Sequence, residues 1–141
     1  MFGHSQFNGV ISGWDVSNVE NMGSMFASSC FNGNISRWDV SHVQQMQMMF
    51  YACPFFNSEI SSWNTSSVTN MNYMFCNAFN FNRNLSEWDV SNVTHMISMF
   101  RNTAIDCDLS GWDVSNVKEH SDIFVGCPLE KRPDKQPKFN D

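Results

Sequence analysis

The chain has 141 residues, with 14 Asp and Glu against 8 Lys and Arg, and a formal net charge of −6. Such an acidic chain is repelled by a phosphate backbone, so the composition argues against a nucleic-acid-binding protein. The sequence contains no run of 18 apolar residues, which argues against direct insertion into a membrane.

The tryptophans recur every 24 or 25 residues, at Trp14, Trp38, Trp63, Trp88 and Trp112. Around each one the pattern is an aliphatic residue, Ser, any residue, Trp, Asp or Asn, Val or Thr, Ser, any residue and Val. A fixed period of this length is typical of a repeat array, in which each unit packs on its neighbours. We therefore expect one domain of about five repeats over residues 1–127, opening in the middle of a repeat, and a flexible C-terminal tail over residues 128–141.

The first element expected in each repeat is a short strand, such as residues 11–16. Alternation along this strand puts Ser12, Trp14 and Val16 on one face and Gly13 and Asp15 on the other. Because Trp shares its face with Val, we expect the tryptophans to form a buried ladder, with an exposed strip for stacking sugar rings as the alternative. A buried indole N–H needs an acceptor, which the Ser two residues earlier or the Asn column could supply.

The second expected element is a short helix over residues 17–26. Ser17 is a favoured N-cap residue. Val19, Met22, Met25 and Phe26 would then form one apolar stripe. We assign the Met-x-x-Met pairs to core packing rather than to a soft-metal site. The fold class predicted from both elements is an α/β repeat solenoid, with one strand and one helix per 24–25-residue coil and the strands stacked into a parallel sheet.

A Phe-Asn pair precedes four of the tryptophans. Its asparagines should form an internal amide ladder that satisfies backbone groups of turns. Asp106 takes the equivalent position in the last repeat. The members of the ladder are Asn8, Asn32, Asn57 and Asn82.

The segment Trp-Asp-Val-Ser-Asn-Val-x-x-Met-x-x-Met-Phe is found at residues 14–26, where Phe31-Asn32 follows it, and at residues 88–100. It resembles the repeat unit of the BspA-type leucine-rich-repeat surface proteins. The resemblance covers nearly all of residues 1–127. It implies an extracellular or cell-surface protein of the kind found in adhesins, and it carries over no catalytic residue. Leu occurs only at positions 85, 109 and 129, so the core should be built from Trp, Met, Phe and Val.

A column of acidic residues follows the tryptophans, at Asp15, Asp39, Asp89 and Asp113, with Asn64 in the central repeat. Stacked carboxylates repel one another, and two explanations remain open. Each Asp could be stabilised by free N–H groups near a helix N-terminus. Alternatively, the column could bind Ca²⁺ or another ligand.

Side chains that point away from the Trp face form the candidate binding surface. The surface contains Asp15, Arg37, Asp39, Ser62, Asn64, Glu87, Asp89 and Asp113. From it we predict a non-enzymatic module that binds a protein or a glycan. The alternative is a structural protein that assembles end to end into fibres through exposed edges. A further apolar patch is expected at Met48, Tyr73 and Ile97.

No nucleophile context, phosphate loop or zinc spacing indicates an enzyme, a cofactor or a metal site. Of the five cysteines, Cys53 and Cys127 are interpreted as small core residues, and one disulfide among Cys30, Cys53 and Cys76 is an alternative. Four Asn-x-Ser/Thr sequences are candidate glycan sites if the chain passes through a eukaryotic secretory pathway. They begin at Asn34, Asn64, Asn84 and Asn92.

Overall fold

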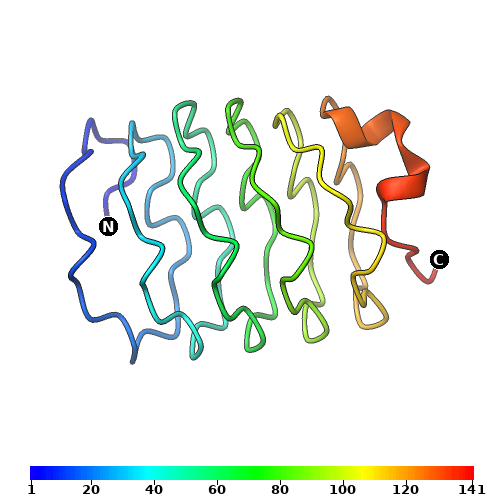
Figure 1. Ribbon diagram of the computed structural model, residues 1–141, viewed down its shortest axis with the longest axis horizontal. Helices are drawn as coiled ribbons and strands as arrows, with labels where there is room; N and C mark the ends of the chain where they lie inside the picture. Colours follow the sequence, from blue (N-terminus) through cyan, green and yellow to red (C-terminus); the bar gives the residue numbers. More distant parts are fainter.

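The computed structural model describes residues 1–141, and the chain winds into successive coils stacked along one axis (Figure 1). We number the coils 1 to 5 by the Trp that each contains, from Trp14 to Trp112. The only helices are two short 3₁₀ turns at the C-terminal end, η1 (Pro128–Lys131) and η2 (Pro133–Lys135). No strand is present, and neighbouring coils are joined by isolated parallel bridges, Asn21 to Gln45, Gln45 to Asn70, Asn70 to His95 and His95 to Glu119.

The predicted α/β solenoid is wrong, because residues 17–26 do not form a helix. The N–H of Met25 donates to the carbonyl of Met22 (3.2 Å), which closes a turn over three residues. The N–H groups of Met22 and Ser24 leave the coil and donate to carbonyls of coil 2, at Gln45 (2.8 Å) and Gln47 (2.9 Å). An α-helix needs its N–H groups for bonds four residues back, so these outward bonds exclude it.

Consecutive turns explain why this segment has an apolar pattern that looks helical. In the turn from Met22 to Met25, Ser24 has φ of 58°, as the third residue of a type II turn requires. Residues on either side of such a turn face the same way, so both methionines reach the core. Positive φ recurs in two columns of the stack, and every residue in them except Gly126 is a non-glycine residue. The first column contains Ser24, Met48, Tyr73, Ser98 and Asp122, and the second contains His4, Ser28, Ala52, Asn77, Asn102 and Gly126.

The predicted strand over residues 11–16 is also wrong. The N–H of Trp14 donates to the carbonyl of Ile11 (3.1 Å), so Ser12 and Gly13 form the corner of a turn. The same turn occurs in all five coils, with donor–acceptor distances of 3.1 Å. A turn at this point interrupts the two-residue alternation, and no parallel sheet forms.

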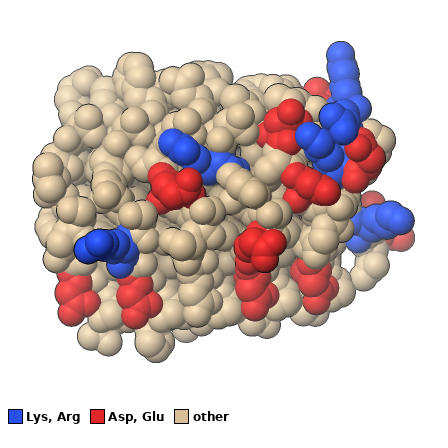
Figure 2. Space-filling model, viewed as in Figure 1, with Lys and Arg blue, Asp and Glu red and all other residues tan.

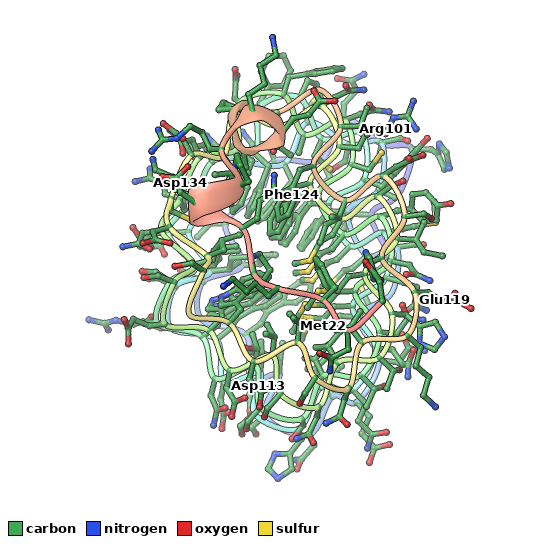
Figure 3. The ribbon with its side chains drawn as sticks, turned by 90° about the vertical axis from the view of Figure 1, so that its right-hand side faces the viewer. Met22, Arg101, Asp113, Glu119, Phe124 and Asp134 are labelled. Carbon is green, nitrogen blue, oxygen red and sulfur yellow. The ribbon has the colours of Figure 1, made fainter.

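The core lies inside the coils (Figure 3), and it is built from columns in which the same or a similar apolar residue recurs from coil to coil. Two phenylalanines stack face to face within a coil, for example Phe50 and Phe56 with ring centroids 3.8 Å apart. Phe50 also stacks on Phe26 and Phe75 of the neighbouring coils, each at 5.6 Å. The methionines of the Met-x-x-Met pairs are buried in this interior, which confirms their assignment to core packing.

Four tryptophans are buried as predicted, at 3 to 5% exposure, whereas Trp14 is 42% exposed. The acceptor of the indole N–H differs from both predicted partners. Trp63 donates to the carbonyl of Ile35 one coil earlier (3.0 Å). Trp38, Trp88 and Trp112 make the equivalent bond at 2.9 to 3.1 Å. Each indole therefore pins its coil to the preceding one.

The asparagine ladder is confirmed, although it lies on the surface rather than inside. The side-chain oxygen of Asn32 accepts the N–H of Asn57 (2.8 Å), and that of Asn57 accepts the N–H of Asn82 (3.0 Å). Asp106 ends the ladder by donating its N–H to Asn82 (3.2 Å). The ladder satisfies one backbone donor per coil.

The difference between 24- and 25-residue spacing arises at a single corner. Coils 3 and 4 each contain an extra residue there, which forms an additional turn closed by Phe56 to Cys53 (3.2 Å) and by Phe81 to Ala78 (3.0 Å). These turns hold Phe55 and Phe79 on the surface. The inserted residue is accommodated without shifting the core columns.

Residues 128–141, the segment expected to form a tail, lie across the last coil (Figure 1). Leu129 is fully buried, and the carbonyl of Lys135 accepts the N–H of Leu109 (2.8 Å). The ring of Phe139 stacks on His120 with centroids 3.9 Å apart. These contacts cover the C-terminal end of the core.

All five cysteines are free, so the disulfide alternative among Cys30, Cys53 and Cys76 is absent from the structure. Cys53 and Cys127 are buried, as predicted for core residues, and Cys76 is buried as well. Burial raises the pKa of the Cys53 thiol, which disfavours its ionised form.

Candidate functional site

The acidic column is held in place by hydrogen bonds within each repeat. Oδ1 of Asp39 accepts the backbone N–H of Ser41 (3.0 Å) and its hydroxyl (2.6 Å). In coil 3, Asn64 accepts the N–H of Ser66 in the same way (3.1 Å). The local explanation of the column is therefore correct, but the donor is a turn rather than a helix N-terminus, and Ser acts as donor instead of as an N-cap acceptor.

These bonds favour the charged form of each Asp. The Ser91 hydroxyl, followed by its backbone N–H, lowers the pKa of Asp89 below the ordinary value of 3.8, and Ser41 does the same for Asp39. The pKa values of Asp15 and Asp113 are lowered by the serines that follow them. The column is consequently a row of ionised carboxylates at neutral pH.

All residues of the candidate binding surface are exposed, at one corner of the stack that we call the recognition ridge. Its members are Asp15, Arg37, Asp39, Ser62, Asn64, Glu87, Asp89 and Asp113. Figure 2 shows carboxylates along the lower edge of the molecule, with a gap near its middle. The sequence-predicted surface is thus one continuous strip, although a series of turns displays it and not a sheet.

The apolar patch predicted at Met48, Tyr73 and Ile97 lies on a different side of the coils. Met48 and Tyr73 occupy the same positive-φ column, and Tyr73 is 38% exposed. Ile97 belongs to the preceding column, and its N–H donates to Asn72 (2.7 Å). The three residues therefore do not share one column.

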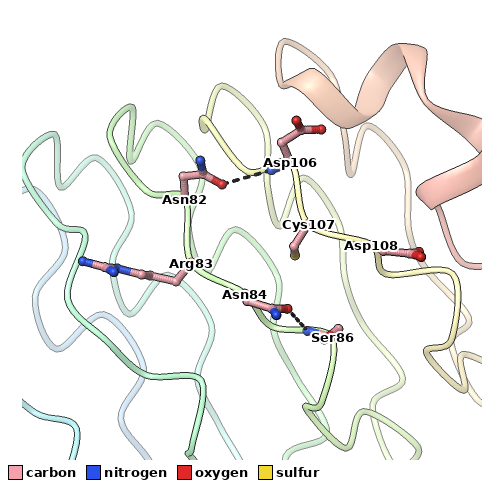
Figure 4. A pocket seen from close by; sticks show the side chains of 7 residues that line it. All are labelled: Asn82, Arg83, Asn84, Ser86, Asp106, Cys107 and Asp108. Carbon is pink, nitrogen blue, oxygen red and sulfur yellow. Dashed lines mark hydrogen bonds between the residues drawn. The ribbon is translucent and has the colours of Figure 1, made fainter.

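A groove of about 430 Å³ lies between coils 4 and 5 and was not anticipated from the sequence (Figure 4). Its lining consists of Asn82, Arg83, Asn84, Ser86, Asp106, Cys107 and Asp108. The available signal was a break in the repeat, where Ile105-Asp106-Cys107-Asp108 replaces the Phe-Asn pattern of the earlier coils.

The charged residues of the groove are engaged outside it. Arg83 extends toward coil 3, where Nε donates to the carbonyl of Asn57 (2.8 Å) and Nη1 lies 3.7 Å from Glu59 (Figure 4). Asp106 pairs with Lys135 (3.2 Å). Asp108 accepts the N–H of the following turn, and the Ser110 hydrogen bonds lower its pKa.

Apart from the second carboxylate oxygens of Asp106 and Asp108, the groups left for a ligand in the groove are uncharged. Asn82 and Asn84 use their side-chain oxygens as acceptors for backbone N–H groups, while their NH₂ groups make no hydrogen bond within the protein. The Ser86 hydroxyl is also without a protein partner, and the half-buried Cys107 lies between the two coils. The structure contains no group of three or more His, Cys, Asp or Glu side chains arranged to hold a metal ion.

Comparison with protein-family models identifies one match, to the family described as "Mycoplasma protein of unknown function, DUF285", over residues 1–64 and 29–135. The two ranges overlap and together cover most of the chain. The chain belongs to the DUF285 family. No curated protein and no solved structure matches it. The DUF285 description names no activity.

The leucine-rich-repeat architecture expected from the BspA resemblance is not present in this DUF285 repeat, which has neither a helix nor a strand in its coils. Neither of the two 3₁₀ turns, η1 and η2, has the length or apolar character of a bilayer-spanning helix. The repeat is instead a series of turns tied together by bonds between coils.

Proposed function

We propose that this DUF285 chain is a non-enzymatic binding module, which recognises a protein or glycan partner at the cell surface or outside the cell. The observation that carries the proposal is the recognition ridge. Its turns have the same hydrogen bonds in each coil, so the backbone is constant while the side chains at Arg37, Ser62 and Glu87 differ. A rigid frame with variable exposed side chains is suited to recognition.

The resemblance to BspA-type surface proteins supports an extracellular location and an adhesin-like role. The acidic charge of the ridge favours a partner with a basic surface or with many hydrogen-bond donors. Because the carboxylates are ordered by their own serines, they lose little conformational freedom on binding.

Binding of the fluorescently labelled chain to intact cells, measured by flow cytometry, tests the proposal. The variant Arg37→Glu/Asp39→Asn/Asp89→Asn changes the ridge while keeping the side-chain acceptors, as Asn64 shows for the native protein. We expect saturable binding by the native chain and a loss of about tenfold or more in the variant. Treatment of the cells with proteases or glycosidases then distinguishes a protein partner from a glycan.

A control variant should make the same kinds of charge change at exposed residues that lie away from the ridge. Lys118→Glu/Asp122→Asn serves this purpose, because both residues are exposed and lie outside the ridge. Equal loss in the control and ridge variants, or no saturable binding by the native chain, would contradict the proposal.

Self-assembly is the second candidate function, supported by apolar surface on coil 1. Met1 and Val10 are 86% and 93% exposed, and Met1 and Trp14 line a groove of about 370 Å³. Residues 128–141 cover the opposite end, so end-to-end fibres would require this segment to move. Light scattering over a concentration series tests the candidate: a constant monomer mass would remove it.

A further inference from the structure

We propose that the groove between coils 4 and 5 binds a neutral, hydroxyl-rich ligand, namely one saccharide unit. This inference rests on the proposed function, since it selects the glycan among the partners of a binding module. It adds the groove to the recognition ridge as a second contact surface.

The size of the groove fits a ligand of this kind. Its volume of about 430 Å³ lies within the range of roughly 300–1,000 Å³ in which proteins bind small molecules. Within it, the long side chain of Arg83 turns back toward coil 3, and Cys107 takes the equivalent position of coil 5. No other pair of neighbouring coils has a groove at this position.

The charge of the groove argues against ionic ligands. A phosphate or carboxylate would need a free cation, but Arg83 is committed to the Asn57 carbonyl and to Glu59. A metal ion would need several free oxygens, but Asp106 pairs with Lys135 and one oxygen of Asp108 is used by its own turn. An ionic ligand would have to break these interactions.

Uncharged groups remain, and their chemistry matches hydroxyl groups. The NH₂ groups of Asn82 and Asn84 donate, and the Ser86 hydroxyl can donate or accept. Sugar hydroxyls also do both, so they can satisfy all three groups together. The backbone turn after Asn84 fixes its side chain through the 3.0 Å bond from the Ser86 N–H, so the amide is ordered before a ligand arrives.

The test is a titration of the ¹⁵N-labelled chain with glucose, galactose and N-acetylglucosamine, each followed by NMR. We expect at least one sugar to produce saturable shifts in the Asn82 and Asn84 side-chain NH₂ signals. Glucose 6-phosphate should bind no more tightly than glucose, because the groove offers no free cation. Tighter binding of the phosphorylated sugar, or saturable shifts outside the groove only, would overturn the inference.

The variant Asn84→Asp removes the NH₂ group and retains the oxygen that holds the Ser86 N–H, as Asp does in the acidic column. Its sugar affinity should fall by about tenfold or more, the usual effect of leaving polar groups unpaired. Asn34→Asp is the matched control, since Asn34 makes the same turn in coil 2 (3.0 Å to the Ser36 N–H) with no groove beside it. Equal affinities of the two variants would overturn the inference.

The outcomes separate this inference from the proposed function. Absence of any sugar shift, together with ridge-dependent binding to cells, overturns the groove and leaves the binding module intact. If a sugar binds in the groove but cell binding does not depend on the ridge, the groove inference is supported and the ridge is excluded as the recognition surface.

Discussion

The indole N–H of Trp63 donates a 3.0 Å hydrogen bond to the carbonyl oxygen of Ile35, one coil earlier. Trp63 is 4% exposed, so neither group has access to water as an alternative partner. The Trp63 side chain therefore stabilises the stack both by burying its ring and by a hydrogen bond to the preceding coil.

Replacing Trp63 with Ala should lower the free energy of unfolding by about 3–5 kcal/mol, because a large buried ring is lost and a carbonyl is left unpaired. Trp63→Phe retains most of the burial and should cost about 1–3 kcal/mol. Urea unfolding followed by circular dichroism measures both. Trp14→Ala is the control, with a cost of roughly 1 kcal/mol or less, because Trp14 is partly exposed and its indole N–H has no protein acceptor. Equal costs at the two positions would contradict the buried ladder.

The positive-φ columns predict that glycine stabilises where it normally destabilises. Ala52 has φ of 52°, a conformation that costs a non-glycine residue about 1–2 kcal/mol. Glycine avoids this cost but loses about 0.5–1 kcal/mol through the entropy of the unfolded chain. Ala52→Gly should therefore raise the free energy of unfolding by roughly 0.5 kcal/mol.

Ala104→Gly is the matched control for that substitution, because Ala104 is partly exposed and does not have positive φ. It should lower the free energy of unfolding by about 0.5–1 kcal/mol. Thermal unfolding distinguishes the two signs. A decrease at both positions would show that Ala52 is not strained.

The acidic column predicts a loss of stability in acid. The folded-state pKa of Asp89 lies below its ordinary value of 3.8, so its contribution is present above that value and disappears as the pH falls through the lowered pKa. Ser91→Ala removes the largest cause of the shift and should raise the pKa of Asp89, as measured by NMR titration of its carboxyl carbon. An unchanged pKa would show that the Ser91 hydroxyl does not hold the carboxylate.

The asparagine ladder predicts that stability depends on the side-chain oxygen of each asparagine, which accepts a hydrogen bond, more than on its NH₂ group. Asn57→Ala leaves the N–H of Asn82 without its 3.0 Å partner and should cost about 1 kcal/mol. Asn57→Asp keeps an oxygen there and should cost less. Hydrogen exchange at the Asn82 amide gives a local readout, with faster exchange expected in the Ala variant only. Equal exchange in all three proteins would argue against the ladder.

The burial of Leu129 predicts that residues 128–141 contribute to the free energy of unfolding. Its side chain is fully buried, so Leu129→Ala should lower the free energy of unfolding by about 2–5 kcal/mol. Lys131→Ala, at an exposed position of η1, should change it by less than about 0.5 kcal/mol. Chemical denaturation measures both, and a negligible effect of Leu129→Ala would show that residues 128–141 do not stabilise the stack.

Much of the molecule could be predicted from the repeat. The burial of Trp38 and its equivalents, the packing of the methionines and the asparagine ladder follow from which residues recur at which position. The exposure of the eight ridge residues follows from the same columns. The groove could not be derived in this way, because it depends on the direction taken by Arg83 and on its bonds to coil 3.

The amino-acid pattern alone determined the period and the residues of the core. It could not determine the backbone, because an apolar residue at every third or fourth position suits both an α-helix and a run of four-residue β-turns. Only the tertiary structure decided between them. In the stack, the N–H groups of Met22 and Ser24 bond to the next coil, and an N–H that is used between coils cannot also close a helix.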